Sequence, residues 1–180
     1  MVCLDLQGKP CLVVGGGRVA TEKVRGLVVS GGDVTVVAPE IDDELAELPV
    51  RLARRRFRRS DVVRRFLVIA ATGDRLVNAS VSDAAAEQGI PCNVADDPEL
   101  CSFILPAIVR RDPIQVGVST GGASPALAQR IRDDIEDLLS PRHAEVARML
   151  KELRPWAKRE FPTYEERRDF FQRLVQEALA

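Results

Sequence analysis

Histidine, aromatic residues and paired cysteines are scarce in this 180-residue sequence. There is one histidine, His143, and Phe, Trp and Tyr together make up 4% of the residues. The four cysteines, at positions 3, 11, 92 and 101, include no C-x-x-C pair. A structural zinc site needs close cysteine pairs or additional histidines, so we expect no metal site. Cys11 and Cys92 lie inside apolar runs, where free thiols are expected to be buried.

The sequence also lacks an excess of charge of either sign and any long hydrophobic run. It has 26 basic and 27 acidic residues, for a formal net charge of -1, which argues against a general nucleic-acid binder. Its longest apolar stretches, such as Phe66–Ala71, fall far short of the roughly twenty residues that span a bilayer. Residues 1–7 lack the basic start and apolar run of a signal peptide. We therefore expect a soluble cytoplasmic protein with neither a membrane nor a nucleic acid as partner.

In the first half of the chain, short apolar runs alternate with helical patterns. This alternation predicts repeated βα units on a parallel sheet, an α/β fold of the Rossmann type. Helices are predicted over 19–29, 40–48 and 75–88. Strands are predicted at Pro10–Val14, Asp33–Ala38, Val50–Ala53, Phe66–Ala71 and Pro91–Ala95, with further strands at Ile104–Leu105 and Ile114–Val118.

The composition changes after Thr120. Ser124 is a candidate N-cap, and Pro125 stands at the first helical position after it. Helices are predicted over 125–139, 141–159 and 164–179. They are too few to bury a large core of their own, so we expect them to pack on the sheet domain, on each other or on a second subunit.

The strongest local motif is G-x-G-x-x-A, at Gly15, Gly17 and Ala20. In the dinucleotide fingerprint the first glycine permits a tight turn, the second lets the backbone approach a pyrophosphate, and the third small residue lets helix and strand pack closely. Here the motif follows a strand and opens a helix, which strengthens the prediction. The alternative is a glycine-rich turn that binds nothing.

The end of the second predicted strand lacks the acid that usually holds the adenosine ribose. Its sequence there is Val37-Ala38-Pro39-Glu40, and Glu40 lies beyond a proline. We interpret Ala38 and Pro39 as contacts to the adenosine half of the cofactor, which leaves NAD versus NADP open. Thr72 and Gly73 follow the fourth strand, where the carboxyl edge of an open sheet meets its ligand.

Two acids, Asp96 and Asp97, follow Asn93 at the end of the fifth predicted strand. A carboxylate there can accept a proton or orient a substrate, but the residues alone favour a turn-capping role before Pro98. A second charged feature is the run of arginines over 51–65. Because arginine outnumbers lysine 22 to 4 in the whole chain, we interpret this run as a solvated face.

Three separated motifs, taken together, resemble the siroheme synthase family. They are V-G-G-G-x-V-A-x-x-K at Val14–Lys23, C-N-V-x-D with S-F-I-x-P over Cys92–Pro106, and V-S-T-G-G-x-S-P-x-L-A at Val118–Ala128. The resemblance covers nearly the whole chain. It implies a Rossmann domain over 1–105, a dimerisation segment over 106–140 and a small helical domain over 141–180, with no methyltransferase domain.

The resemblance also implies an activity, the NAD-dependent oxidation of precorrin-2 to sirohydrochlorin in siroheme biosynthesis. Ferrous iron insertion into sirohydrochlorin and a homodimer are further family properties, of which the iron insertion stays open here. Asp96 matches the family's catalytic aspartate, which reverses the turn-capping interpretation for that residue. The cofactor-binding set is Gly15, Gly16, Gly17, Arg18, Val19, Ala38, Pro39, Thr72, Gly73 and Asn93, and the substrate-cleft set is Ser102, Thr120, Gly121, Gly122 and Ser124.

A different class of function competes with this one: a Rossmann module that senses NAD and regulates a partner without chemistry. It would explain the glycine motif. It would not explain why an acid and the Gly121-Gly122 segment should accompany that motif.

Overall fold

A computed structural model describes residues 2–180 and divides the chain into two compact units, one ending at Leu105 and one beginning at Pro106. Among residues 2–180, no helix is both long enough and apolar enough to cross a membrane.

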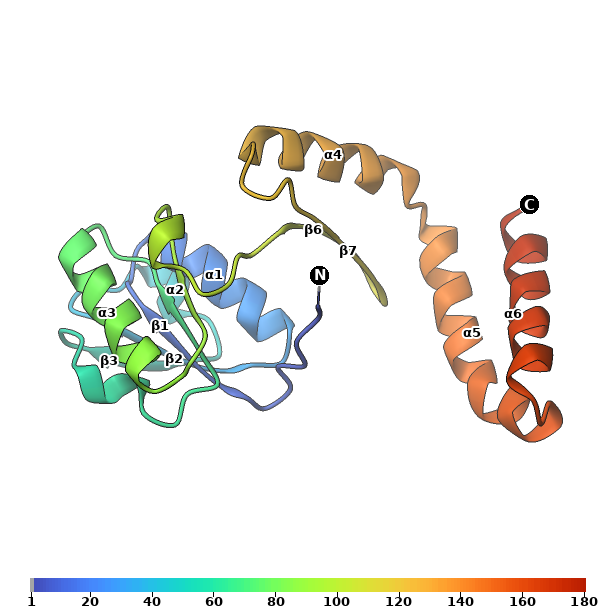
Figure 1. Ribbon diagram of the computed structural model, residues 1–180, viewed down its shortest axis with the longest axis horizontal. Coiled ribbons are helices and arrows are strands. Elements are labelled where there is room, and N and C mark those ends of the chain that lie inside the picture. Colours follow the sequence, from blue (N-terminus) through green and yellow to red (C-terminus); the bar gives the residue numbers. More distant parts are fainter. Residues whose placement is uncertain (1) are drawn as a thin grey trace. The chain divides into compact units, whose positions relative to one another are not determined.

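The first unit is built on a five-stranded parallel sheet with the order β3-β2-β1-β4-β5. Figure 1 labels the first three of these strands in chain order, β1, β2 and β3. The chain starts in the middle, builds outward to β3, and then returns to the other side of β1. The strand order therefore reverses between β1 and β4, the position at which open α/β sheets bind ligands. The strands are β1 (Pro10–Val14), β2 (Asp33–Ala38), β3 (Arg51–Arg54), β4 (Leu67–Ala70) and β5 (Cys92–Val94).

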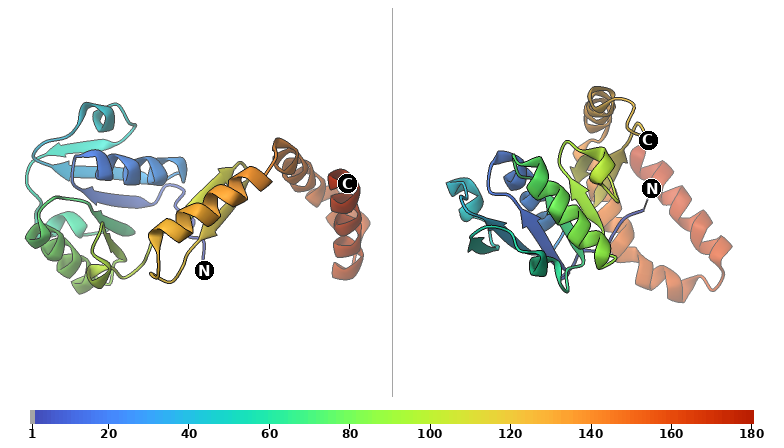
Figure 2. Two further views of the ribbon diagram at one scale, coloured as in Figure 1. Left: turned by 90° about the horizontal axis from the view of Figure 1, so that it is seen from above. Right: turned by 60° about the vertical axis from the view of Figure 1, so that its left-hand side comes forward.

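Helices cover both faces of this sheet (Figure 2). On β1, Val13 packs into one core with α1 (Arg18–Val29) and α2 (Asp43–Ala46), whereas Leu12 and Val14 pack into the other with α3 (Arg75–Glu87). Successive side chains of a strand point to opposite faces, so a strand covered on both faces must be apolar throughout. This explains the unbroken hydrophobic runs in the sequence. The 3₁₀ segments η1 (Arg59–Val62) and η2 (Pro98–Leu100) complete the unit.

The second unit begins with an antiparallel hairpin, β6 (Ala107–Arg111) and β7 (Ile114–Val118), on which α4 (Pro125–Leu138) packs. Two long helices follow, α5 (Pro141–Glu160) and α6 (Tyr164–Leu179), which lie side by side. Thr163 begins α6 with a capping box: its hydroxyl accepts from the Glu166 N–H, and the Glu166 carboxylate accepts from the Thr163 N–H.

The predicted α/β fold of the Rossmann type, followed by helices, is confirmed. One strand prediction was wrong. Ile104 and Leu105 form no strand and are both exposed, and the pairing segment begins two residues later, at Ala107. Pro106 separates the two segments, and a proline has no N–H to donate to a ladder.

Candidate functional site

A cleft of about 1010 Å³ opens in the first unit where β1, β2, β4 and β5 end. This is the edge of the sheet at which the sequence predicts a cofactor. The cleft is lined by ten of the predicted site residues: Gly15, Gly16, Gly17, Arg18, Val19, Ala38, Pro39, Thr72, Gly73 and Asp96.

The three glycines at the head of α1 serve different purposes. Gly15 has φ +129, and a Cβ there would collide with the carbonyl oxygen of Ala71. A Cβ on Gly16 would collide in the same way with the carbonyl oxygen of Glu40, so both positions need glycine for packing. At Gly17, by contrast, a Cβ would meet no atom within 4 Å. That open space is where a ligand can approach the backbone.

The N-terminus of α1 faces this space without a partner of its own. Gly17 is the N-cap, and within residues 2–180 no side chain caps the helix. The first N–H groups of a helix have no partner inside the helix and carry partial positive charge. Uncapped donors beside an open glycine fit the phosphates of a dinucleotide. Ala20, fully buried against the sheet, keeps helix and strand close.

Two charged side chains of the cleft wall, one after β2 and one after β3, form no ion pair within the described part of the chain. Glu40 and Arg56 both line the cleft and are exposed. Arg56 belongs to the arginine run that we interpreted as a solvated face. Neighbouring arginines instead form ion pairs and do not line the cleft: Arg55 lies 2.7 Å from Asp61, and Arg59 pairs with Glu87. No sequence pattern distinguishes Arg56 from these neighbours.

A buried asparagine anchors the Thr72–Gly73 loop. The Asn78 Oδ1 accepts from the Thr72 N–H at 3.2 Å and from the Thr72 hydroxyl at 2.7 Å, and its Nδ2 donates to the Thr72 carbonyl at 3.0 Å. The sequence analysis missed Asn78. The one signal that could have identified Asn78 is its place in the helical pattern: it is a polar residue one turn from Val81, on the buried face of α3.

The two neighbouring acids after β5 have different surroundings. Asp96 is exposed, lines the cleft and has a left-handed backbone with φ +60. Asp97 does not line the cleft; its carboxylate accepts from the Nε of Arg75 at 2.9 Å, and its side chain is 16% exposed. Neither carboxylate caps η2. Non-glycine residues with positive φ are uncommon, and aspartate is among the few that tolerate this conformation.

Two predicted residues of the first unit do not line the cleft. Asn93 is buried, and its Nδ2 donates to the carbonyl of Phe103 at 3.0 Å. The Ser102 hydroxyl accepts from the Cys92 N–H at 2.7 Å. Both side chains therefore fasten the segment after η2 to β5. The roles of Asn93 toward the cofactor and of Ser102 toward the substrate stay predictions.

The remaining predicted substrate residues belong to the second unit, in the turn before α4. The Thr120 hydroxyl accepts from the Ser124 N–H at 3.1 Å, and the Ser124 hydroxyl accepts from the Leu127 N–H at 3.2 Å. Gly121 and Gly122 both have positive φ, which the turn requires. The turn by itself therefore explains why hydroxyl and glycine residues occur in this segment.

The buried thiols are not poised for chemistry. Burial raises the pKa of Cys11 to about 11 and that of Cys92 to about 12, so both stay protonated at neutral pH. Cys3, in contrast, is exposed. Within the described residues, no three His, Cys, Asp or Glu side chains gather closely enough to hold a metal ion.

Comparison with known proteins gives consistent results for both units. Residues 2–107 match the family model "Putative NAD(P)-binding", and residues 111–138 match "Sirohaem biosynthesis protein central". Siroheme synthases from Methylococcus capsulatus and Thioalkalivibrio sulfidiphilus match this chain with 43% and 45% sequence identity, and each match covers 97% of it. The chain spans 38% and 37% of their respective lengths.

A solved structure, "SirC, precorrin-2 dehydrogenase", resembles the fold. It has a TM-score of 0.82 and 28% identity, and the match covers 100% of this chain and 92% of that one. The dinucleotide predicted from the glycine motif, and the nicotinamide cofactor implied by the resemblance, agree with the NAD(P)-binding family model.

Proposed function

The chain belongs to the siroheme synthase family, and on that premise we propose that it oxidises precorrin-2 to sirohydrochlorin with NAD as cofactor. The observation that carries the proposal is the cleft itself. It combines an uncapped helix N-terminus at an open glycine with an unpaired carboxylate, Asp96, in one cavity of about 1010 Å³. A module that only senses NAD would need the first feature but not the second.

Different residues of the cleft contact different parts of the dinucleotide in this proposal. The backbone N–H groups after Gly17 bind the pyrophosphate, while Ala38 and Pro39 contact the adenosine half. Thr72 and Gly73, held by Asn78, form the opposite wall. When bound, the dinucleotide supplies the electron acceptor for the oxidation.

Asp96 provides the acid–base chemistry in this proposal. Oxidation of the macrocycle by loss of two electrons also releases a ring proton, and a carboxylate without a hydrogen-bond partner is free to accept it. No hydrogen bond or ion pair occupies the Asp96 side chain within residues 2–180. The same carboxylate would take pyrrole N–H protons if ferrous iron is a second substrate.

The direct test is to add precorrin-2 and NAD to the purified protein and to follow the absorbance of reduced nicotinamide. Formation of NADH together with sirohydrochlorin supports the proposal. A folded protein that binds NAD and forms no NADH is the result expected of the sensing module. Adding ferrous iron to sirohydrochlorin and following the loss of the metal-free spectrum tests the chelatase activity separately.

We also propose that the chain forms a homodimer through its second unit. On α4, Leu127, Ile131 and Leu138 are 51%, 37% and 73% exposed, and apolar side chains gathered on one helix are typical of an association surface. Light scattering should give twice the chain mass for the wild type, and an Ile131→Glu variant should shift that mass toward the monomer. A wild-type monomer at micromolar concentration would contradict the proposal.

A further inference from the structure

A second cavity, of about 790 Å³, lies in the second unit between α5 and α6. The glycine motif and the acids of the first unit have no part in it. Its lining side chains are cationic, aromatic, amide or apolar: Arg154, Lys158, Tyr164, Arg167, Arg168, Phe171, Gln172, Val175 and Gln176. We refer to it as the α5–α6 groove.

The charges of the α5–α6 groove are all of one sign. Residues 141–180 contain seven acidic side chains, and none of them lines it. Arg168 is partly neutralised by Asp169, at 2.8 Å, and Arg167 donates to the carbonyls of Phe161 and Pro162. Two cations one helical turn apart on α5, Arg154 and Lys158, have no ion pair or hydrogen bond within the described chain.

The walls of the groove are held in place by aromatic packing behind it. Trp156 of α5 and Phe170 of α6 lie 5.6 Å apart between ring centroids, and Phe170 contacts Phe171, which lines the groove, at 5.3 Å. Tyr164 is 72% exposed at its edge. Unpaired cations beside aromatic side chains are suited to a flat anion. A ring can stack on the aromatic faces, and guanidinium groups bind carboxylates.

We propose that the α5–α6 groove binds a polycarboxylated tetrapyrrole through its acid side chains. The inference rests on the proposed function, which makes such a macrocycle the substrate. The volume of the groove lies within the roughly 300–1000 Å³ of small-molecule sites. Arg154 and Lys158 bind carboxylates, and Tyr164 and Phe171 contact the macrocycle.

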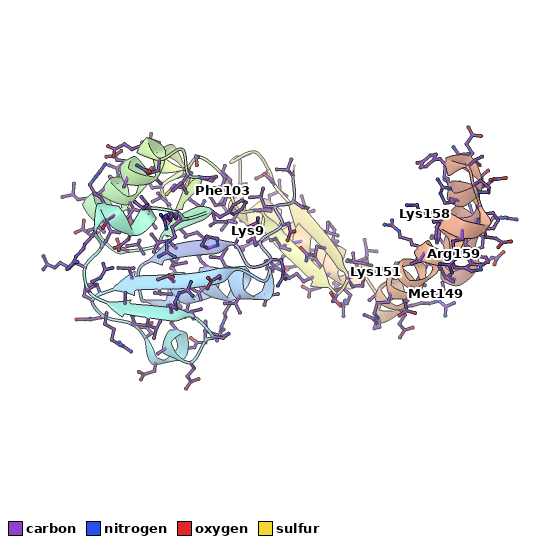
Figure 3. The ribbon with its side chains drawn as sticks, turned by 90° about the horizontal axis from the view of Figure 1, so that it is seen from below. Lys9, Phe103, Met149, Lys151, Lys158 and Arg159 are labelled. Carbon is purple, nitrogen blue, oxygen red and sulfur yellow. The ribbon has the colours of Figure 1, made fainter. Side chains whose placement is uncertain are left out.

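The test uses uroporphyrin, a stable octacarboxylate tetrapyrrole, and measures its binding to the full chain by fluorescence at low ionic strength. In the double variant Arg154→Ala/Lys158→Ala we expect the dissociation constant to rise by about tenfold or more, since two charge-assisted contacts are lost. The matched control is Lys151→Ala/Arg159→Ala. It removes two positive charges from the same helix, and neither side chain lines the groove. Figure 3 labels both residues together with Lys158. The affinity of this control should stay within about twofold of the wild type.

Equal affinity in the wild type and the groove variant overturns the inference, and so does an equal loss in the control, which would indicate attraction by net charge alone. Circular dichroism verifies that both variants remain helical. A methyl-esterified porphyrin should bind both variants and the wild type alike.

The proposed function can fail separately from this inference. A protein that forms NADH from precorrin-2 but shows no contrast between the two variants refutes the groove. A protein that shows the contrast but forms no NADH refutes the dehydrogenase activity.

Discussion

Replacing Asp96 by asparagine tests the proposed acid–base residue with little structural disturbance. The Asp96 side chain is exposed and unpaired, and asparagine also tolerates its φ of +60. We therefore expect the free energy of unfolding to change by less than about 0.5 kcal/mol. Alanine would add backbone strain at this position, so it is the poorer choice.

The expected loss of activity is large. Positioned acid–base groups contribute roughly 10²- to 10⁴-fold to a rate, so kcat for precorrin-2 oxidation should fall by at least about a hundredfold, or about 2.7 kcal/mol of barrier. NAD affinity should stay within about twofold, because in this proposal the α1 N–H groups hold the phosphates and Asp96 does not.

The neighbouring Asp97→Asn variant is the matched control. We expect it to lower stability and to leave turnover unchanged, the reverse of Asp96→Asn. The Asp97 carboxylate is largely buried against Arg75, so losing the ion pair should cost about 0.5–1 kcal/mol and lower Tm by about 1–4 °C. Its turnover should stay near that of the wild type, because it does not line the cleft.

Thermal melts, NAD titration and steady-state rates on the two variants give the complete comparison. Wild-type turnover in Asp96→Asn would refute the assignment of Asp96, and so would an equally severe loss of turnover in Asp97→Asn.

Three further predictions follow from the structure. Gly17→Val should abolish NAD binding, measured by calorimetry, with Tm nearly unchanged because the space there is open; retained affinity would contradict the phosphate site. Gly15→Ala should instead lower Tm and the soluble yield, because its φ is positive and its Cβ would meet the Ala71 carbonyl; a wild-type melt would count against this packing. The Arg55 guanidinium, by hydrogen bonding, lowers the pKa of Asp61, so the ion pair stabilises the fold above the unfolded-state pKa of Asp61, and that stabilisation is lost as pH falls through the lower folded pKa. Asp61→Asn should therefore flatten the acid side of the Tm–pH curve, and parallel curves would refute this contribution.

The features that depend on local patterns could be predicted from the sequence. The strands β1 and β2 and the helix α6 have the bounds expected from apolar runs and caps. The cofactor cleft follows from the βα order, because parallel strands end at the same edge of a sheet. Ile104 and Leu105 misled the strand prediction because an apolar pair before a proline resembles a strand until its pairing partner is known.

Within the site, the sequence pattern leaves side-chain direction open, because composition does not determine it. Asn93 belongs to a matching motif, yet its amide is used by a carbonyl ten residues later. Arg56 is one of many arginines, and only the path of the chain after β3 brings it to the cleft. Asp96 and Asp97 are adjacent in sequence, and the positive φ at Asp96 gives them different surroundings.

The Asn78 clamp has a consequence for how pH acts on this protein. An amide neither gains nor loses a proton in water, and Asn78 makes three hydrogen bonds to Thr72. The Thr72 hydroxyl also bonds the backbone N–H and carbonyl of Asp74, which do not titrate either. The loop on that side of the cofactor should keep its shape from mildly acidic to mildly alkaline buffer. A change of rate across that pH range would then come from the reacting groups and not from a loosening of the loop beside the cofactor.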